Sequence, residues 1–314
     1  MIYDIELMKT QQKAYLALTA TSLIWGTTWV AMKLGVKQMP ALEMAAIRQF
    51  IGGCIFITFF LIRKEKLPTF KQFRQLFILS IFTFVLANGV STWSLMYIPS
   101  GLASVIGALY PLSVVVIEYF FFNNKNINAL TIVGILIGIA GICFVFYENA
   151  FLVHPDGYLF GLFLAVIAML SWSFSTIMIG REKVKVNAYF GMGWQLLFGS
   201  VMMTVISYAS GKNIPLTEIS MQAWLSIFYL VLAGSVFAII AFIYSMKHLP
   251  PAIASLYAYI NPIVAISIGA IWLNEKVTIN FIVGTMITLL GVYLVNKAFK
   301  KQYLKNKNSV EGEN

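Results

Sequence analysis

The chain has 314 residues, of which 60% are hydrophobic and only 11% are charged, and its net charge is +10. A soluble domain carries about 25% charged residues, so this composition excludes an ordinary cytosolic enzyme. Its high hydrophobicity also excludes a disordered protein. We therefore expect most of the chain to lie in lipid.

Ten stretches are long and apolar enough for transmembrane helices, because a helix needs about 20 mainly apolar residues to cross the bilayer core. They span about 14–34, 42–62, 76–96, 101–122, 129–147, 157–179, 189–209, 222–246, 251–273 and 279–297. The short connections leave no room for a soluble domain. The sequence thus predicts an all-α integral membrane protein, with an N-terminal segment at 1–13 and a basic tail at 298–314.

The basic residues predict the orientation, because cytoplasmic loops carry an excess of Lys and Arg. If the N-terminus is inside, the inner segments hold 17 basic residues and the outer segments hold 4. We therefore expect a multi-pass protein of the plasma (inner) membrane with both termini in the cytoplasm. The basic residues are scattered over six segments rather than clustered on one face, so no nucleic-acid partner is expected.

Two halves of the chain, 14–147 and 157–297, carry similar residues in the same order. The matches include Trp25 with Trp172, Pro99–Ser104 with Pro250–Ser255, and Pro111 with Pro262. Each half contains five predicted spans, an odd number, so the second half is expected to cross the membrane upside down. Inverted repeats are typical of secondary transporters, whose substrate site lies near the midplane between the halves.

Several motifs resemble those of one transporter family. Ser22-Leu-Ile-Trp25-Gly26-Thr-Thr, Arg48-Gln49-Phe50 and Ser255–Pro262 followed by Leu273-Asn-Glu275-Lys276 are similar to signatures of EamA-type permeases in the drug/metabolite transporter superfamily. The resemblance covers nearly the whole chain. It implies ten helices in two inverted five-helix repeats, alternating access, and frequently export of amino acids or other small metabolites. The first repeat has Asn124 where the second has Glu275, so no symmetrical role follows for that carboxylate.

Two ionisable residues lie well inside predicted spans, where charge is costly and indicates function. Arg48 is a candidate for holding a substrate carboxylate with its planar set of hydrogen-bond donors. Alternatively, its side chain locks helices together or extends to the outer membrane interface. Glu118 shares a helical face with small residues, so we expect it to face the bundle, where the low dielectric favours the protonated form of a carboxyl group and makes it a candidate for proton coupling. The alternative is a hydrogen-bonded carboxyl group that only packs.

Pro111 and Pro262 occupy equivalent positions in mid-span and predict kinks, because proline removes an intrahelical hydrogen bond. Such kinks are tolerated beside protein or a water-filled cavity, so both prolines are candidates for a gate or site. Tyr257, Tyr259 and Asn261 lie close to Pro262 and suit an amphipathic metabolite. Hydrogen bonding between helices is the equally weighted alternative for them.

Further polar and aromatic residues are candidates for cavity walls or for recognition of a cation. These candidates are Asn88 and Trp93 in the third span, and Trp25, Trp172 and Gln195 on matching helices of the two halves. Packing and a place in the interfacial aromatic belt are the alternatives, and are expected for Trp29 and Trp272.

The chain carries no motif of an enzyme. His154 and His248 lack metal-ligand spacing, and no Walker A pattern is present, so we expect no catalytic residue, no metal and no cofactor. The leading hypothesis is a secondary active exporter of amino acids or similar small metabolites, with proton coupling left open. A drug or cation efflux pump is the first alternative, and an integral-membrane lipid-handling protein or enzyme is the second. Both a monomer and a homodimer remain open.

Overall fold

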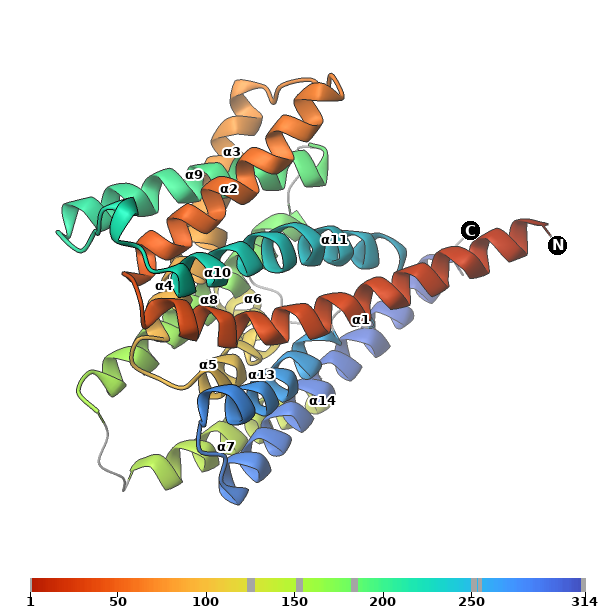
Figure 1. The fold of residues 1–314 in the computed structure, drawn as a ribbon. Helices are drawn as coiled ribbons and strands as arrows, with labels where there is room; N and C mark the ends of the chain where they lie inside the picture. The colour runs from red at the N-terminus through yellow and green to blue at the C-terminus, as the bar shows by residue number, and fades with distance from the viewer. Residues whose placement is uncertain are drawn as a thin grey trace.

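A computed structural model describes residues 2–122, 128–150, 155–181, 186–249, 253 and 256–311. Side chains are described within these ranges from residue 10 to residue 298, apart from 147–150. Asn124, His154 and most of the motif at 250–255 lie outside the described residues. The part of the chain that is described forms helices and no strand (Figure 1).

The helices follow the predicted spans closely. In chain order they are α1 (Ile2–Val36), α2 (Ala41–Ile62), α3 (Phe70–Ser80), η1 (Ile81–Gly89), α4 (Val90–Ser94), α5 (Ser100–Gly107), α6 (Tyr110–Phe121), α7 (Ala129–Ala150), α8 (Tyr158–Arg181), α9 (Ala188–Ala209), η2 (Leu216–Glu218), α10 (Met221–Tyr229), η3 (Leu230–Phe237), α11 (Ala238–His248), α13 (Tyr257–Leu273) and α14 (Ile279–Glu311).

Eight helical stretches of the described chain are long and apolar enough to cross a membrane, and α13 is a shorter apolar helix. The predicted stretch at 14–34 lies within the 35-residue helix α1. The structure therefore supports an all-α membrane protein. The count of ten spans and the inverted repeat stay predictions.

Three of these stretches combine more than one helical segment. In the third and eighth predicted spans, the α-helix passes into a π-helix, η1 and η3, before it continues as α4 and α11. A π-helix is rare and frequently marks a functional site. The stretch Ser100–Phe121 instead breaks at a turn between α5 and α6, and Pro111 lies in the first turn of α6. The expected irregularity at Pro111 is thus a break, whereas Pro262 lies inside the continuous helix α13.

Helices α7 and α14 pack tightly against each other through glycines. An added side chain at Gly291 would meet the backbone of Gly138, and one at Gly134 would lie 2.9 Å from the Gly291 carbonyl oxygen. Small residues allow such close approach of helices in lipid. The fifth and tenth predicted spans therefore form a scaffold pair beside the other helices (Figure 1).

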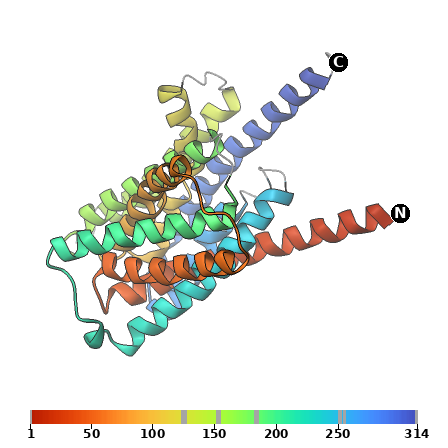
Figure 2. The same cartoon turned by 90° about the horizontal axis from the view of Figure 1, so that it is seen from above.

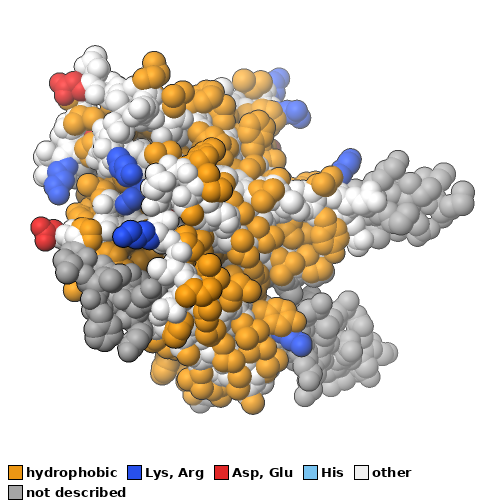
Figure 3. Space-filling model, turned by 60° about the horizontal axis from the view of Figure 1, so that its bottom comes forward, with side chains coloured by type: hydrophobic (Ala, Val, Ile, Leu, Met, Phe, Trp, Pro, Cys, Tyr) orange, Lys and Arg blue, Asp and Glu red, His pale blue; other side chains and the backbone are white. Residues whose placement is uncertain are grey.

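The beginning of α1 and the end of α14 extend from the same side of the bundle in both views (Figures 1 and 2). Hydrophobic side chains cover most of the face shown in Figure 3, and basic side chains lie toward its two ends. This distribution suits a molecule whose middle section is surrounded by lipid.

Candidate substrate cavity

A cavity of about 200 Å³ lies at the centre of the bundle. It is lined from both halves of the chain, by α1, α2, η1, α4, α5 and α6 from the first half and by α8, α9, η3, α11 and α13 from the second. Helices α7 and α14 contribute no lining residue. Of the predicted site residues, the cavity brings together Trp25, Arg48, Asn88, Trp172, Tyr257 and Asn261.

Arg48 projects from α2 and is 6% exposed. Its Nε donates to Ser235 Oγ at 2.9 Å, and its Nη1 lies 3.5 Å from the sulfur of Met32. No acidic side chain within the described residues forms an ion pair with it. A buried charge without a partner is costly, so the wall of the cavity carries a guanidinium group that favours an anion.

Gly234 connects this charge to the aromatic side of the cavity. Its carbonyl oxygen accepts a hydrogen bond from Trp25 Nε1 at 3.2 Å. A side-chain carbon added to Gly234 would lie 3.2 Å from Nη2 of Arg48 and 2.9 Å from the methyl group of Thr28. The π-helix η3 therefore needs glycine here, because both Arg48 and α1 approach its backbone.

Aromatic rings form another part of the cavity wall. The Trp25 ring lies 6.5 Å from Trp172, 4.9 Å from Phe242 and 5.3 Å from Tyr257, measured between ring centroids. Tyr110 stacks on Tyr257 at 6.2 Å. Trp25 and Trp172, which match in the two sequence halves, thus meet in an edge-to-face pair, the geometry that aromatic rings prefer.

Two buried amide oxygens at the cavity have no hydrogen-bond partner among the described residues: Oε1 of Gln49 and Oδ1 of Asn261. The Gln49 amide nitrogen donates to Asn88 Oδ1 at 3.0 Å. Buried polar groups without a partner are unusual in folded proteins. The cavity thus offers free acceptors as well as a cation, between apolar walls.

The remaining predicted site residues do not line the cavity. Trp93 packs edge-to-face against Phe160 at 5.4 Å. Tyr259 accepts a hydrogen bond from Asn296 of α14. It therefore fits the alternative prediction, hydrogen bonding between helices. Gln195 is buried and its Oε1 has no partner among the described residues. Neither Pro111 nor Pro262 reaches the cavity.

Glu118 also lies away from the cavity, near the end of α6. Its carboxylate oxygen lies 3.4 Å from Nη2 of Arg181 on α8, and the two side chains are 23% and 47% exposed. The break between α5 and α6 explains this placement, because positions before and after the turn do not share the face of one continuous helix. Glu118 therefore ties α6 to α8.

Trp29 packs against a cluster of buried hydrophobic side chains, as expected, and it also lines the cavity, where it lies against Gly107. Trp272 is 70% exposed, in agreement with a place at the surface. Sequence reasoning missed the lining residues Gln49, Gly234, Ser235 and Phe242. Gln49 directly follows Arg48, and Ser235 interrupts an apolar run. Neither sequence signal, however, distinguishes a residue that lines a cavity from one that packs between helices.

Within the described residues, no group of His, Cys, Asp or Glu side chains is arranged to hold a metal ion. The described lining combines apolar and aromatic side chains with a few amides and hydroxyls and one guanidinium. This set suits the reversible binding of a small organic solute, because such sites are largely apolar with a few placed polar groups.

Comparison with known proteins gives a consistent result. The chain is 32% identical to the uncharacterized inner membrane transporter YedA of Escherichia coli over 254 residues, 81% of this chain and 80% of YedA. It is 27% identical to the uncharacterized transporter YoaV of Bacillus subtilis over 291 residues, 92% of this chain and 99% of YoaV. A solved crystal structure shares the fold with a TM-score of 0.63 and 16% identity, covering 90% of this chain and 97% of that one.

The family comparison covers both halves of the sequence. The profile of the EamA-like transporter family matches residues 12–147 and again residues 159–297. Together with the apolar helices and the central cavity, these matches show that the chain is a multi-pass membrane transporter and belongs to the EamA-like transporter family.

Proposed function

We propose that this protein is a secondary active exporter of amino acids or similar small metabolites that carry a carboxylate. The observation that carries the proposal is Arg48, a buried guanidinium that lines the cavity without an acidic partner in the described chain. Arginine binds carboxylates through two parallel hydrogen bonds. A substrate carboxylate would compensate this charge.

The other cavity walls support an amphipathic substrate. The free oxygens of Gln49 and Asn261 suit a donor such as an ammonium group, and the rings around Trp25 suit an apolar or aromatic side chain. The volume of about 200 Å³ is below the roughly 300–1,000 Å³ of sites for drug-sized ligands. A small metabolite therefore fits better than a large drug.

The proposal includes alternating access between two inverted five-helix repeats, with ten spans and both termini in the cytoplasm. A cavity lined from both halves supports this mechanism, because the halves can then rock around a shared site. The excess of basic residues in the predicted inner segments supports the orientation. The likeness to YedA, whose name places it in the inner membrane, supports the same location here.

Efflux of drugs or cations is the second candidate, and the aromatic wall favours it because aromatic faces attract cations. The cavity, however, carries an arginine, and no carboxylate is among the described residues that line it. A cationic substrate would meet a charge of its own sign, so we favour the carboxylate.

Counterflow in proteoliposomes tests the proposal. Vesicles loaded with one unlabelled solute from a panel of amino acids, organic cations and nucleotide sugars are mixed with the same labelled solute outside. We expect exchange of at least one amino acid or related carboxylate and none of the cations. Arg48→Gln should abolish that exchange.

Arg74→Gln is the matched control, because Arg74 is exposed on α3 and lies outside the cavity. It should exchange substrate as the unaltered protein does. Exchange of cations alone would instead support the second candidate, and exchange of no solute together with lipid scrambling would overturn the transporter mechanism.

We also propose Glu118 as the residue for proton coupling. Protonation of its carboxyl group would break the ion pair with Arg181 and weaken the contact between α6 and α8. Glu118→Gln removes the ionisable group but keeps the shape of the side chain, so it should remove the pH dependence of exchange while exchange continues. An unchanged pH profile would contradict proton coupling at Glu118 and would mean that the Glu118–Arg181 pair only holds α6 against α8.

A further inference from the structure

A carboxylate from the loop after α13 holds the N-terminus of α5. Glu275 Oε1 accepts a hydrogen bond from the Ser100 backbone N–H at 2.7 Å. Its Oε2 accepts from Ser100 Oγ at 3.0 Å and from the Gly101 backbone N–H at 3.1 Å. Charge-assisted bonds to a helix N-terminus are among the stronger hydrogen bonds in proteins, so this contact joins the first half of the chain to the second.

The loop is shaped to deliver this side chain. Asn274 ends α13 in the left-handed region, with φ 52° and ψ 35°, and the Glu275 backbone N–H returns to the Gly269 carbonyl oxygen at 3.2 Å. An added carbon at Gly269 would lie 2.7 Å from Oε2 of Glu275 and 2.9 Å from Oγ of Ser100. A larger residue at 269 would therefore separate the carboxylate from α5.

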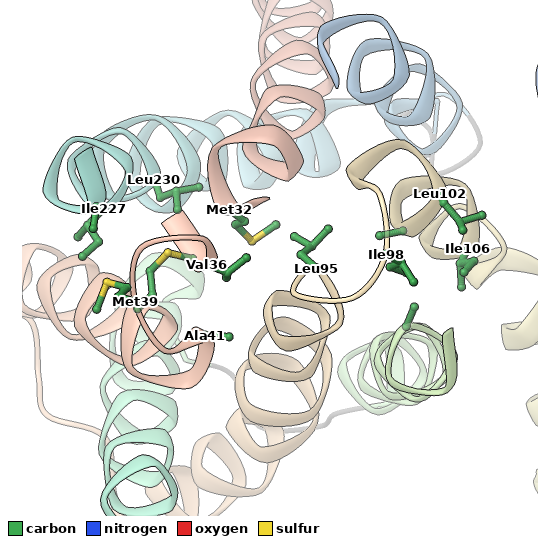
Figure 4. Close-up of a cluster of buried hydrophobic side chains, with 14 of the residues drawn as sticks. Met32, Val36, Met39, Ala41, Leu95, Ile98, Leu102, Ile106, Ile227 and Leu230 are labelled. Atoms are coloured by element: carbon green, nitrogen blue, oxygen red, sulfur yellow. The ribbon is translucent and has the colours of Figure 1, made fainter. Parts of the chain in front are cut away.

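A second charge holds the other side of the same turn. Lys33 of α1 donates from Nζ to the carbonyl oxygens of Leu95 and Ile98, at 2.5 and 3.0 Å. Buried apolar side chains of α1, of the turn between α4 and α5 and of α5 form one cluster, in which Met32 lies next to Leu95 (Figure 4). The turn from α4 to α5 is therefore clamped between α1 and the loop after α13.

This clamp and the substrate cavity are adjacent along α5. Ser104 lines the cavity and lies three residues after Gly101, about 4.5 Å along the helix at a rise of 1.5 Å per residue. We propose that the contact of Glu275 with Ser100 and Gly101 is the outer gate of the transporter, closed here and broken when the cavity opens outward. The inference rests on the proposed alternating access.

Hydrogen bonds of this kind suit a reversible gate. When the gate opens, water can bind the N–H groups of α5 in place of the carboxylate. Water can also solvate Glu275, which already lies near the end of the bundle. The net free-energy cost of opening is therefore small, although three hydrogen bonds break. The first half of the chain has Asn124 at the position that matches Glu275. The proposal therefore concerns the Glu275 contact at the outer end and assigns no matching carboxylate to the first half of the chain.

Accessibility of a cysteine in the cavity tests the gate without knowledge of the substrate. Ser91 lines the cavity and is partly exposed, so Ser91→Cys is introduced after the native thiols are removed by Cys54→Ala and Cys143→Ala. A charged, membrane-impermeant thiol reagent is then added to the outer face of intact cells. We expect Glu275→Gln to speed labelling about tenfold, and Ser100→Ala, which removes one of the three bonds, to speed it about threefold.

Glu218→Gln is the matched control, because Glu218 is exposed in the predicted outer loop between α9 and α10. It should leave the labelling rate unchanged. Thermal unfolding in detergent shows whether each variant is folded. If Glu275→Gln does not fold, Ser100→Ala still tests the gate. Equal labelling in all three variants would overturn the proposal, as would faster labelling from the cytoplasmic face only.

Counterflow by the same proteins separates the gate from the proposed function. Normal exchange of a carboxylate by the unaltered protein, together with unchanged labelling in Glu275→Gln, would overturn the gate and leave transport intact. Raised labelling in Glu275→Gln, with no exchange of any solute by the unaltered protein, would retain the gate and overturn the transport proposal.

Discussion

Arg48 and Glu118 are both charged side chains inside membrane-spanning helices, and the structure gives them opposite surroundings. Arg48 is buried at the cavity and contacts a serine hydroxyl and a methionine sulfur. Glu118 is partly exposed near the end of α6 and pairs with Arg181. The residues are equally conspicuous in the sequence, but only Arg48 lacks an opposite charge among its described neighbours.

This difference separates a binding group from a group that links helices. Arg48 can gain most from a ligand, because a buried charge without a partner has lost its hydration and gained no ion pair. Glu118 already has its counter-charge, so a substrate has little to add. Substitutions at the cavity should therefore change substrate affinity, and substitutions at the α6–α8 contact should not.

The largest expected effect compares the two charges directly. Arg48→Gln should weaken binding of the exchanged carboxylate about 30-fold or more, because loss of one partner from a buried charge pair costs about 2–5 kcal/mol. Glu118→Gln should change affinity less than about fivefold, since a partly exposed ion pair contributes about 0–1 kcal/mol. Quenching of tryptophan fluorescence by the substrate gives both affinities. Similar losses of affinity in the two variants would contradict the distinction between Arg48 as a binding group and Glu118 as a link between helices.

A smaller effect is expected from displacement of Arg48 without removal of its charge. Gly234→Ala places a methyl group 3.2 Å from Nη2 of Arg48, and overpacking of this kind costs about 1–3 kcal/mol. Affinity should fall about tenfold. Gly180→Ala is the control, because a side chain there meets no atom within 4 Å. If the two variants bind substrate equally well, the position of Arg48 is unimportant for recognition.

The smallest expected effect is a change in KM when a tryptophan inside the cavity is replaced, compared with one outside it. Trp25→Phe keeps an aromatic ring but loses the hydrogen bond to the Gly234 carbonyl, which contributes about 0.5–1.5 kcal/mol. The KM for counterflow should rise roughly two- to tenfold. Trp93→Phe, which alters a ring packed on Phe160, should leave KM unchanged. An equal rise in both would mean that the cavity wall has no special part in binding.

The spans were the most predictable part of the fold, because the length and apolar character of a helix in lipid are local properties. The ends of α2 and α9 differ from the predicted stretches by a single residue. The break before Pro111 also had a local signal. The π-helices η1 and η3 had none, since an extra residue in a helical turn depends on what packs against it rather than on composition.

The candidate site was predictable in part. A charge in a span drew attention to Arg48, and the repeated tryptophans drew attention to the Trp25–Trp172 pair. The same reasoning gave equal weight to Tyr259 and Trp93, which contact neighbouring helices instead. Periodicity alone cannot rank such residues, because every helix of a bundle has several faces that are turned away from lipid.

The sequence by itself determined that the chain is an apolar, helical transporter of the EamA-like family, because composition, span length and motif order are properties of the chain alone. The tertiary structure decided which polar groups meet. It placed Arg48 against Ser235 of η3, left Gln49 and Asn261 with free oxygens at the cavity, and laid Glu275 on the N-terminus of α5. These contacts join residues about 170 or more positions apart in most cases, and only the packing of the helices fixes such long-range pairs.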